Sequence, residues 1–351
     1  MTSYWYCTRE DVQRALDSKN TARNADQIDR AVGAATLSIE GLTHCRFYPQ
    51  TGTRYFDWPN YQYARPWRLW LDSNQVASVT SLVSGGVTIS SNDYFLRRSD
   101  DFDEAPYNYI EIDLDSSSAF SSGSTHQRSI AVTGVFINCA ADESPAGATA
   151  EALDDSETGL DITDSALIGI GQIIKVDSER MVVTGKSMLD SGQNTAGALT
   201  ASVSDVTVPV GSGAAFSVGE VILIDSERML IVDIAGNNLT VKRQWDGSVL
   251  ATHANPSDVY ALRTLTVVRG ALGTTAATHL TAAPIVKHVV PTLVRNLAIA
   301  EALSTLLQEG SGYARQAGSG ENARDVSGVG IQALRDAVYT AFGRKARIGA
   351  I

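Results

Sequence analysis

We predict an α+β fold from three features of the sequence. Apolar residues recur at helical spacing near both ends of the 351-residue chain, strand patterns fill residues 46–139, and a β-rich block at about 160–288 contains the same phrases twice. Together these features predict a helical bundle frame, made from the N- and C-terminal helices, with a β-section and a large nested all-β insertion.

Two helices are predicted near the N-terminus. The first follows Thr8, which can cap it together with Asp11 three residues later. The second begins near Asn24 and has an apolar stripe at steps of four, three, four and three. Its members are Ile28, Val32, Ala35, Ile39 and Leu42. Alanines and Gly33 beside the stripe would let another helix approach closely, so this helix suits a packed bundle or a subunit contact.

The β-section is predicted from alternation and from turn residues. Ile110, Ile112 and Leu114 alternate with acidic residues, as in a half-buried strand, and Ser84, Gly85 and Gly86 form a turn between two apolar runs. The polar segment 140–147 that follows is predicted to be a loop leading into the insertion.

Two phrases recur in the insertion, in an order that excludes a simple tandem repeat. Val-Asp-Ser-Glu-Arg-Met-Val-Val at 176–183 returns as Ile-Asp-Ser-Glu-Arg-Met-Leu-Ile at 224–231, and Leu-Thr-Val-Lys-Arg at 239–243 returns as Leu-Thr-Val-Val-Arg at 265–269. We call the first repeated phrase the front phrase and the second the rear phrase. Their order along the chain is front, front, rear, rear. The order therefore predicts that one β-module is inserted into a loop of another, since loop tips tolerate insertions.

These patterns define the expected domains. Residues 1–140 and 289–351 form the frame with its β-section, and 145–288 form the inserted β-domain. Within the insertion, the outer module covers about 160–198 and 263–288, and the inner module about 199–262.

The chain returns to helical spacing after the insertion. Pro291 suits a first helical turn, and a stripe follows at Leu293, Leu297, Ala300, Leu303 and Leu307. A last helix is marked by Ile331, Leu334, Val338 and Ala341, and a basic tail follows it.

Composition limits the function classes. A net charge of −11 and a pI near 4.9 argue against a body that grips nucleic acid, because phosphate binding needs basic patches. Cys7, Cys45 and Cys139 are widely spaced, so neither a zinc site nor a disulfide framework is predicted. With no signal peptide or apolar span in the sequence, we expect a soluble protein made in a reducing cytoplasm, with no membrane contact.

No catalytic, cofactor-binding or metal site is predicted. His44 and Cys45 are adjacent and would point apart on a helix, so they do not form a nucleophile pair. His253 and His279 occupy equivalent repeat positions without companion ligands, which favours a turn or packing role over a metal.

Two pairs of carboxylates in the repeat, Asp177 with Glu179 and Asp225 with Glu227, lie two residues apart. They could bind a cation, but a solvated hairpin is the favoured interpretation because calcium needs six or more oxygens.

With the insertion set aside, the chain is similar to a known family. The relevant parts are the run 71–82, Gly86 to Thr88, Asp93 with Tyr94, the strand 130–136, and the Pro-initiated helix 291–307. They resemble the head-to-tail connector (adaptor) proteins of long-tailed bacteriophages over about 5–139 and 290–345. The duplicated module resembles small β-domains of phage structural proteins, but short family members lack such an insertion, so no role for it is implied.

The resemblance implies a virion protein of the head–tail neck, assembled in the host cytoplasm. It would form a homo-oligomeric ring, commonly of twelve subunits, between the portal protein and a stopper or tail-terminator protein, and would extend the channel through which double-stranded DNA passes. Portal-contact candidates are Ile331, Leu334, Val338, Phe342, Arg344, Lys345 and Arg347. Subunit-packing candidates are Ile28, Val32, Ile39, Leu293, Leu297 and Leu303.

Two other functions remain open. A phage tail or surface protein could bind host carbohydrate through the β-modules, although Trp245 is the only tryptophan in the insertion. A hydrolase is disfavoured because no triad, metal set or nucleotide loop is recognisable in the sequence. We expect the insertion to project outward from the ring, because it would otherwise block a DNA channel.

Overall fold

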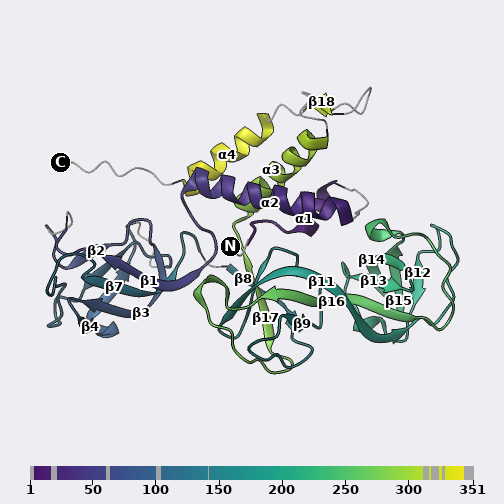
Figure 1. Cartoon of the computed structure of the whole chain (residues 1–351), viewed down its shortest axis with the longest axis horizontal. Coiled ribbons are helices and arrows are strands. Elements are labelled where there is room, and N and C mark those ends of the chain that lie inside the picture. The colour runs from purple at the N-terminus through teal and green to yellow at the C-terminus, as the bar shows by residue number, and fades with distance from the viewer. Residues whose placement is uncertain are drawn as a thin grey trace. The chain divides into compact units, whose positions relative to one another are not determined.

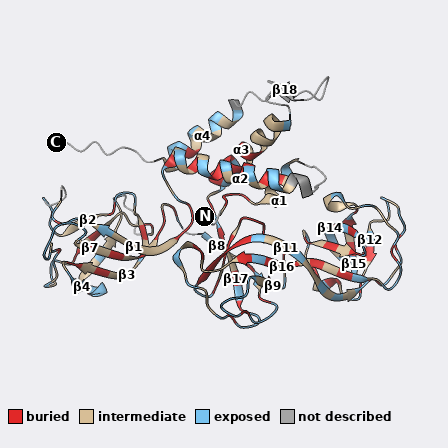
Figure 2. Ribbon diagram, in the orientation of Figure 1, coloured by how far each residue is buried: buried red, intermediate tan, exposed pale blue. Residues whose placement is uncertain are grey.

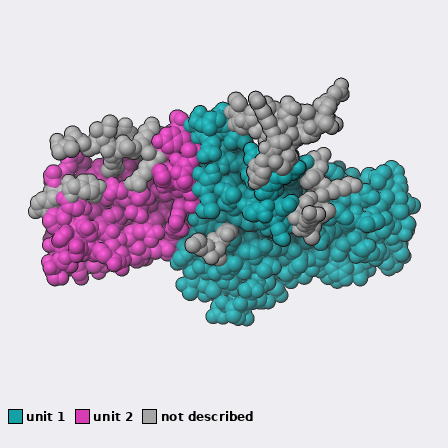
Figure 3. All heavy atoms as spheres, turned by 45° about the horizontal axis from the view of Figure 1, so that its top comes forward, with its two compact units in different colours: residues 1–39, 143–288, 292–338 teal, residues 40–142, 289–291, 339–351 magenta. Residues whose placement is uncertain are grey.

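The computed structural model describes residues 4–16, 22–60, 64–99, 104–140, 142–310, 316–317, 324–325 and 329–343. The fold of these residues is mixed α/β, with α-helices and large antiparallel sheets, as the sequence predicts (Figure 1). The chain divides into two compact units, coloured in Figure 3. Unit 1 contains 1–39, 143–288 and 292–338, and unit 2 contains 40–142, 289–291 and 339–351.

The α-helices come from the two ends of the chain. They are α1 (Arg9–Leu16), α2 (Ala22–Thr43), α3 (Thr292–Gly310) and α4 (Val329–Phe342). The predicted cap of α1 is confirmed: the Asp11 amide donates to Thr8 Oγ1 and the Thr8 amide donates to Asp11 Oδ2, both at 3.1 Å. No helix in the described part of the chain is both long and apolar enough to cross a membrane.

Ion pairs join the helices inside unit 1. The Arg9 guanidinium binds the Asp29 carboxylate, which links α1 to α2. Arg295 Nη2 lies 2.6 Å from Asp11 Oδ1, which links α3 to α1. Arg30 of α2 reaches Glu309 of α3 at 2.8 Å. Helices that are far apart in the sequence are therefore neighbours in this unit.

Unit 2 contains the β-section. Its first sheet has the order β1-β7-β3-β4 and its second the order β2-β6-β5. Both sheets contribute to one core, which includes Trp58, Leu69, Ile110 and Val132. The predicted turn at Gly85 and Gly86 is confirmed, since Ser84 pairs with Val87 across it and both glycines have positive φ. The strands are β1 (Gln50–Phe56), β2 (Arg68–Trp70), β3 (Val76–Ser84), β4 (Val87–Ile89), β5 (Tyr94–Arg97), β6 (Tyr109–Ile112) and β7 (Ile130–Phe136).

The duplicated block forms one ten-stranded antiparallel sheet with the order β12-β15-β14-β13-β16-β11-β10-β17-β8, and β9 pairs with β16. Its longest strands, β11 and β16, pair along most of their length (Figure 1). The strands are β8 (Asp142–Ala148), β9 (Gly159–Asp161), β10 (Ile173–Val176), β11 (Glu179–Asn194), β12 (Thr207–Pro209), β13 (Val221–Ile224), β14 (Glu227–Ala235), β15 (Asn238–Lys242), β16 (Asp258–Val268) and β17 (Pro284–Val289).

Matching pairings show how the two copies are arranged. Val176 pairs with Ile285 in the outer copy, as Ile224 pairs with Val259 in the inner copy. Isolated bridges also match: Leu153 with His279 corresponds to Leu199 with His253. The first half of β11 and the second half of β16 belong to the outer copy, and the other halves belong to the inner copy. The inner copy therefore continues the pair of strands that the outer copy begins. In the strand order, the strands of the inner copy follow those of the outer copy through the shared pair β11 and β16.

The structure places both modules somewhat earlier in the chain than the sequence does. The outer copy begins with β8, where the sequence predicts a loop at 140–147, and that loop prediction is wrong. β8 lies at the edge of the sheet beside β17, and an edge strand can include Pro145, whose nitrogen has no proton to donate. In the inner copy, the second half of β11 is the counterpart of β8. The inner copy therefore begins before its predicted start at about 199.

Each module has its own apolar core (Figure 2). The outer core includes Leu160, Ile174, Met181 and Leu265, and the inner core includes Val208, Ile222, Met229 and Leu239. Alternate residues of the strands supply these cores, as period-two side-chain alternation requires. The modules are joined by a buried carboxylate: Glu220 accepts from Arg263 at 2.7 and 2.8 Å, and from the Ser165 amide of the outer module at 3.1 Å.

The N-terminal segment is bound to the outer module within unit 1. The Trp5 amide donates to Gly171 O at 3.0 Å, and the Arg9 amide donates to Ile170 O at 3.2 Å. Glu10 accepts from the Ile170 amide at 2.9 Å and lies 3.2 Å from Lys186 Nζ. The insertion is therefore attached by more than its two covalent connections.

We predict that Gly171→Ala weakens this attachment. Gly171 has φ of +92°, and a Cβ there would lie 2.0 Å from the Trp5 ring. The expected cost is about 1–3 kcal/mol, with faster amide hydrogen exchange at 5–10 and 169–172. Gly159→Ala is the matched control, because a Cβ at Gly159 meets no atom within 4 Å. Equal exchange rates in the two variants would contradict the prediction.

Candidate functional site

Two candidate sites stand out among the described residues of unit 1. One is a pair of equivalent groups in the modules, which we call the outer cluster (Asp177, Glu179, Arg269 and His279) and the inner cluster (Asp225, Glu227, Arg243 and His253). The other is a pocket formed by α2, α3 and α4.

The inner cluster is centred on Glu227, whose side chain is fully buried. Arg243 donates to its two oxygens through Nε and Nη2, both at 2.7 Å. The amides of Gln244 and Ala251 donate to the same carboxylate at 3.1 and 3.0 Å, and His253 Nε2 lies 3.1 Å from it. A carboxylate can be buried at this position because each of its oxygens is hydrogen-bonded to donors.

The outer cluster repeats this arrangement. Arg269 donates to both oxygens of Glu179 at 2.8 Å, the amides of Gly270 and Ala277 donate at 2.9 and 3.0 Å, and His279 Nε2 lies at 2.9 Å. Equivalent residues in the two modules thus make equivalent bonds. The repeated phrases therefore encode a three-dimensional arrangement as well as strands.

The arginines extend each cluster to further segments. Arg243 Nη1 donates to the carbonyls of Thr200 and Asp205, at 3.1 and 3.0 Å. Arg269 Nη1 donates in the same way to Asp154 and Glu157, at 2.7 and 2.8 Å. One guanidinium thus ties a surface loop to the buried carboxylate in each module.

The surroundings determine the charge of the two glutamates. Burial by itself raises the pKa of Glu179, but the hydrogen bonds from Arg269, His279 and two backbone amides outweigh it and lower the pKa to about 2. The same balance lowers the pKa of Glu227 to about 2. Both carboxylates are therefore ionised at neutral pH.

The prediction that the paired carboxylates lie on a solvated hairpin is correct for the aspartates and wrong for the glutamates. Asp177 and Asp225 lie at the exposed turns with positive φ, with side chains 60% and 57% exposed, but Glu179 and Glu227 are fully buried. Arg243 and Arg269 were not singled out from the sequence. Their recurrence at the end of both rear phrases, opposite a recurring glutamate, was the available signal. In the described residues, no group of three His, Cys, Asp or Glu side chains is placed to hold a metal ion.

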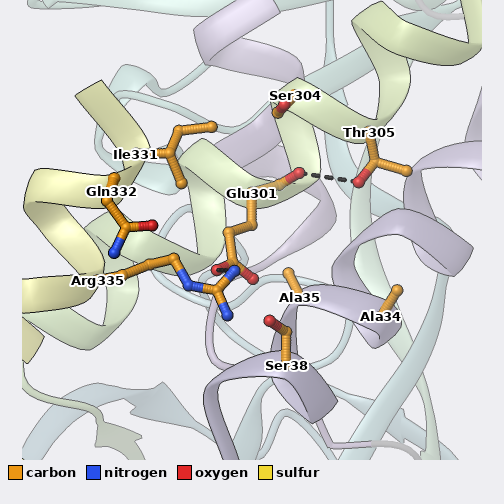
Figure 4. A pocket seen from close by; sticks show the side chains of 9 residues that line it. All are labelled: Ala34, Ala35, Ser38, Glu301, Ser304, Thr305, Ile331, Gln332 and Arg335. Carbon is orange, nitrogen blue, oxygen red and sulfur yellow. Dashed lines mark hydrogen bonds and ion pairs between the residues drawn. The ribbon is translucent and has the colours of Figure 1, made fainter. Parts of the chain in front are cut away.

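The pocket has a volume of about 400 Å³ and is lined by side chains of α2, α3 and α4 (Figure 4). Glu301 of α3 is buried, and its Oε1 lies 3.1 Å from Nη1 of Arg335 on α4. Burial raises the pKa of Glu301, while Ser38 and Arg335 act in the opposite direction. The pocket is polar, and its charged pair lies across the contact between α3 and α4.

The portal-contact candidates fall in different environments. Val338 is fully buried, and Ile331, Leu334 and Phe342 are half-buried. In unit 2, the Phe342 ring makes an edge contact with Phe47 at 5.3 Å. Arg344, Lys345 and Arg347 lie outside the described residues.

The subunit-packing candidates are mostly interior to this chain. Ile28, Val32, Ile39 and Leu297 are buried, Leu303 is half-buried, and Leu293 is 39% exposed. On α2, the large apolar residue Leu37 is 70% exposed, and the sequence stripe did not include it.

The adjacent His44 and Cys45 have separate surroundings. His44 is exposed, with φ of +53°, whereas Cys45 Sγ donates to Phe342 O at 3.4 Å in unit 2.

Comparisons of the chain with known protein families, with curated proteins and with solved structures found no match.

We predict that Glu227→Gln destabilises the inner module by about 3–5 kcal/mol, because the neutral amide leaves Arg243 buried without a partner charge. Urea unfolding followed by hydrogen exchange in 199–262 measures the effect. Asp233→Asn is the matched control, since Asp233 is exposed on the same strand and should change stability by less than about 0.5 kcal/mol. Similar losses in both variants would show that the buried ion pair contributes little.

Acid should destabilise both modules in a defined range. The folded pKa values of Glu179 and Glu227, about 2, lie below the ordinary value of 4.5, so the folded state binds fewer protons than the unfolded state. The ionised glutamates therefore contribute to the free energy of unfolding in full above about pH 4.5, and this stabilisation is lost as the pH falls towards about 2. Urea titrations at successive pH values should show the decline, and it should be smaller in Glu179→Gln.

Proposed function

We propose that the chain is the subunit of a head-to-tail connector of a long-tailed bacteriophage. In this proposal, twelve copies form a ring between the portal of the filled head and a stopper or tail-terminator protein, and the ring extends the DNA channel. The work of such a protein is done by its interfaces, without a catalytic step.

One observation carries the proposal: helices from opposite ends of the chain are paired in one compact unit. Arg295 of α3 binds Asp11 of α1, and Arg30 of α2 binds Glu309 of α3. The part of the chain between α2 and α3 includes two β-modules with separate apolar cores. This arrangement supports a helical frame that can carry a large insertion while its own contacts are kept.

The exposed side of α2 supports a contact between subunits. Arg30, Ala34 and Leu37 are exposed and follow one another at steps of four and three, so they form one stripe. The small side chain of Ala34, one helical turn before Leu37, leaves room for a neighbouring helix. We assign this stripe, in place of the buried apolar stripe, as the subunit contact of the proposed ring.

The charge of the chain supports passage of DNA without binding. At a net charge of −11, the ring would repel the phosphates of a duplex in its channel, and no tight complex with counterion release would form. The portal contact is assigned to α4 and to the basic residues Arg344, Lys345 and Arg347.

Electron microscopy of the purified chain, alone and mixed with portal rings from the same phage, tests the proposal. The expected result is a twelve-fold ring seated on the portal. A chain that remains monomeric and never binds the portal at micromolar concentrations would contradict it.

We predict that Leu37→Glu prevents ring assembly while the subunit stays folded. The side chain is 70% exposed, so the substitution leaves the core intact but places a charge in the proposed contact. Leu280→Glu is the matched control, because Leu280 is 80% exposed on the outer module. Analytical ultracentrifugation and circular dichroism separate assembly from folding. Rings formed equally by both variants would exclude the α2 stripe as the contact.

A further inference from the structure

The histidines of the two clusters have carboxylates on both sides. His253 Nδ1 lies 2.7 Å from Asp225 Oδ2, and its Nε2 lies 3.1 Å from Glu227 Oε2. His279 has the same surroundings, with Asp177 at 2.8 Å and Glu179 at 2.9 Å. Both rings are buried, at 0% and 1% side-chain exposure.

This geometry constrains the protons on each ring. An ionised carboxylate only accepts hydrogen bonds, whereas a neutral imidazole donates from one nitrogen and accepts at the other. The buried glutamates are ionised, and the aspartates are more than half exposed to water. A neutral ring would therefore place one nitrogen lone pair against a carboxylate oxygen at hydrogen-bond distance. Only the doubly protonated ring donates on both sides.

We propose that His253 and His279 are held as imidazolium ions in the folded chain, and that each module is a proton-dependent fold that loosens when its histidine is deprotonated.

The charges of each cluster agree with this proposal. In the inner cluster, Asp225 and Glu227 carry two negative charges, and Arg243 and the His253 imidazolium carry two positive charges. The outer cluster balances in the same way with Asp177, Glu179, Arg269 and His279. Loss of the histidine proton would leave an excess negative charge next to a fully buried carboxylate, where charge is expensive to leave unpaired.

The other segments that pack on each ring contribute backbone contacts. His253 exchanges two backbone hydrogen bonds with Leu199, at 2.9 Å each, and His279 exchanges two with Leu153, at 2.8 and 2.9 Å. Charged side chains near the clusters include Asp205 beside Arg243, and Asp154 and Asp155 beside Arg269. Release of the proton would therefore loosen the loops 244–253 and 270–279, which the glutamates and histidines hold together.

The direction of the linkage follows from the proton count. The folded state would bind a proton in each module that the unfolded chain releases above the ordinary titration range of histidine, at about pH 6.5. Stability should then fall as the pH rises above this range, and two modules should give twice the pH dependence of one. This device is independent of the proposed ring, since it concerns the isolated chain.

Nuclear magnetic resonance of the full-length chain, labelled with ¹⁵N in histidine, tests the proposal. Imidazolium gives two similar nitrogen shifts, whereas a neutral ring gives two widely separated ones. At pH 8 we expect His253 and His279, assigned with His253→Gln and His279→Gln, to retain the imidazolium pattern. A neutral pattern for both buried histidines at pH 8, in a folded chain, would overturn the proposal.

A second measurement separates a proton-dependent role from simple packing. Asp225→Asn keeps an oxygen that can accept from His253 but removes the charge, and Asp177→Asn does the same in the outer module. Each variant should lose the imidazolium pattern of its own histidine at a pH where the wild-type chain keeps it, and the histidine of the other module should be unchanged. Stability losses that are equal at pH 6 and pH 9, with unchanged histidine spectra, would show a packing role only and would contradict the proposal.

Discussion

A buried glutamate that accepts five hydrogen bonds is the interaction on which each module depends. Glu179 and Glu227 each receive two bonds from an arginine, two from backbone amides and one from a histidine. In each module these donors lie on one short segment, 243–253 or 269–279, so a single carboxylate holds that whole segment against the strand that carries it. Because a buried carboxylate without such partners would be strongly destabilising, the donors and the acceptor have to occur together. Both modules contain the same buried glutamate together with all of its hydrogen-bond donors.

Much of the architecture could be predicted from local patterns. The helical stripes, the cap at Thr8 and Asp11, the glycine turn at 85–86 and the nested order of the repeated phrases all depend on residues near one another, or on direct comparison of two stretches. β8 was missed because its polar sequence resembles a loop. It becomes a strand through pairing with β17 at the sheet edge, and that partner lies more than a hundred residues away.

The clusters and the helix contacts could be predicted only in part. The sequence drew attention to His253, His279 and the paired carboxylates, but it gave no means of deciding which carboxylate is buried. That depends on the turn: Asp177 and Asp225 occupy the left-handed position of the hairpin and face water, while the glutamates begin the next strand and face inward. Contacts such as Glu10 with Lys186 and Glu301 with Arg335 join elements that are distant in the sequence, so no local sequence pattern predicts them.

The pairing of β11 with β16 has a consequence for how such a chain can grow. The inner copy enters and leaves through adjacent antiparallel strands, so its addition lengthens an existing ladder. The hairpin of β14 and β15, closed by Gly236 and Asn237, is the counterpart of the point where the outer copy opens. A gene encoding this chain could therefore acquire a third copy there, or lose the second, by one in-frame event that leaves the remaining strands of the ladder in order.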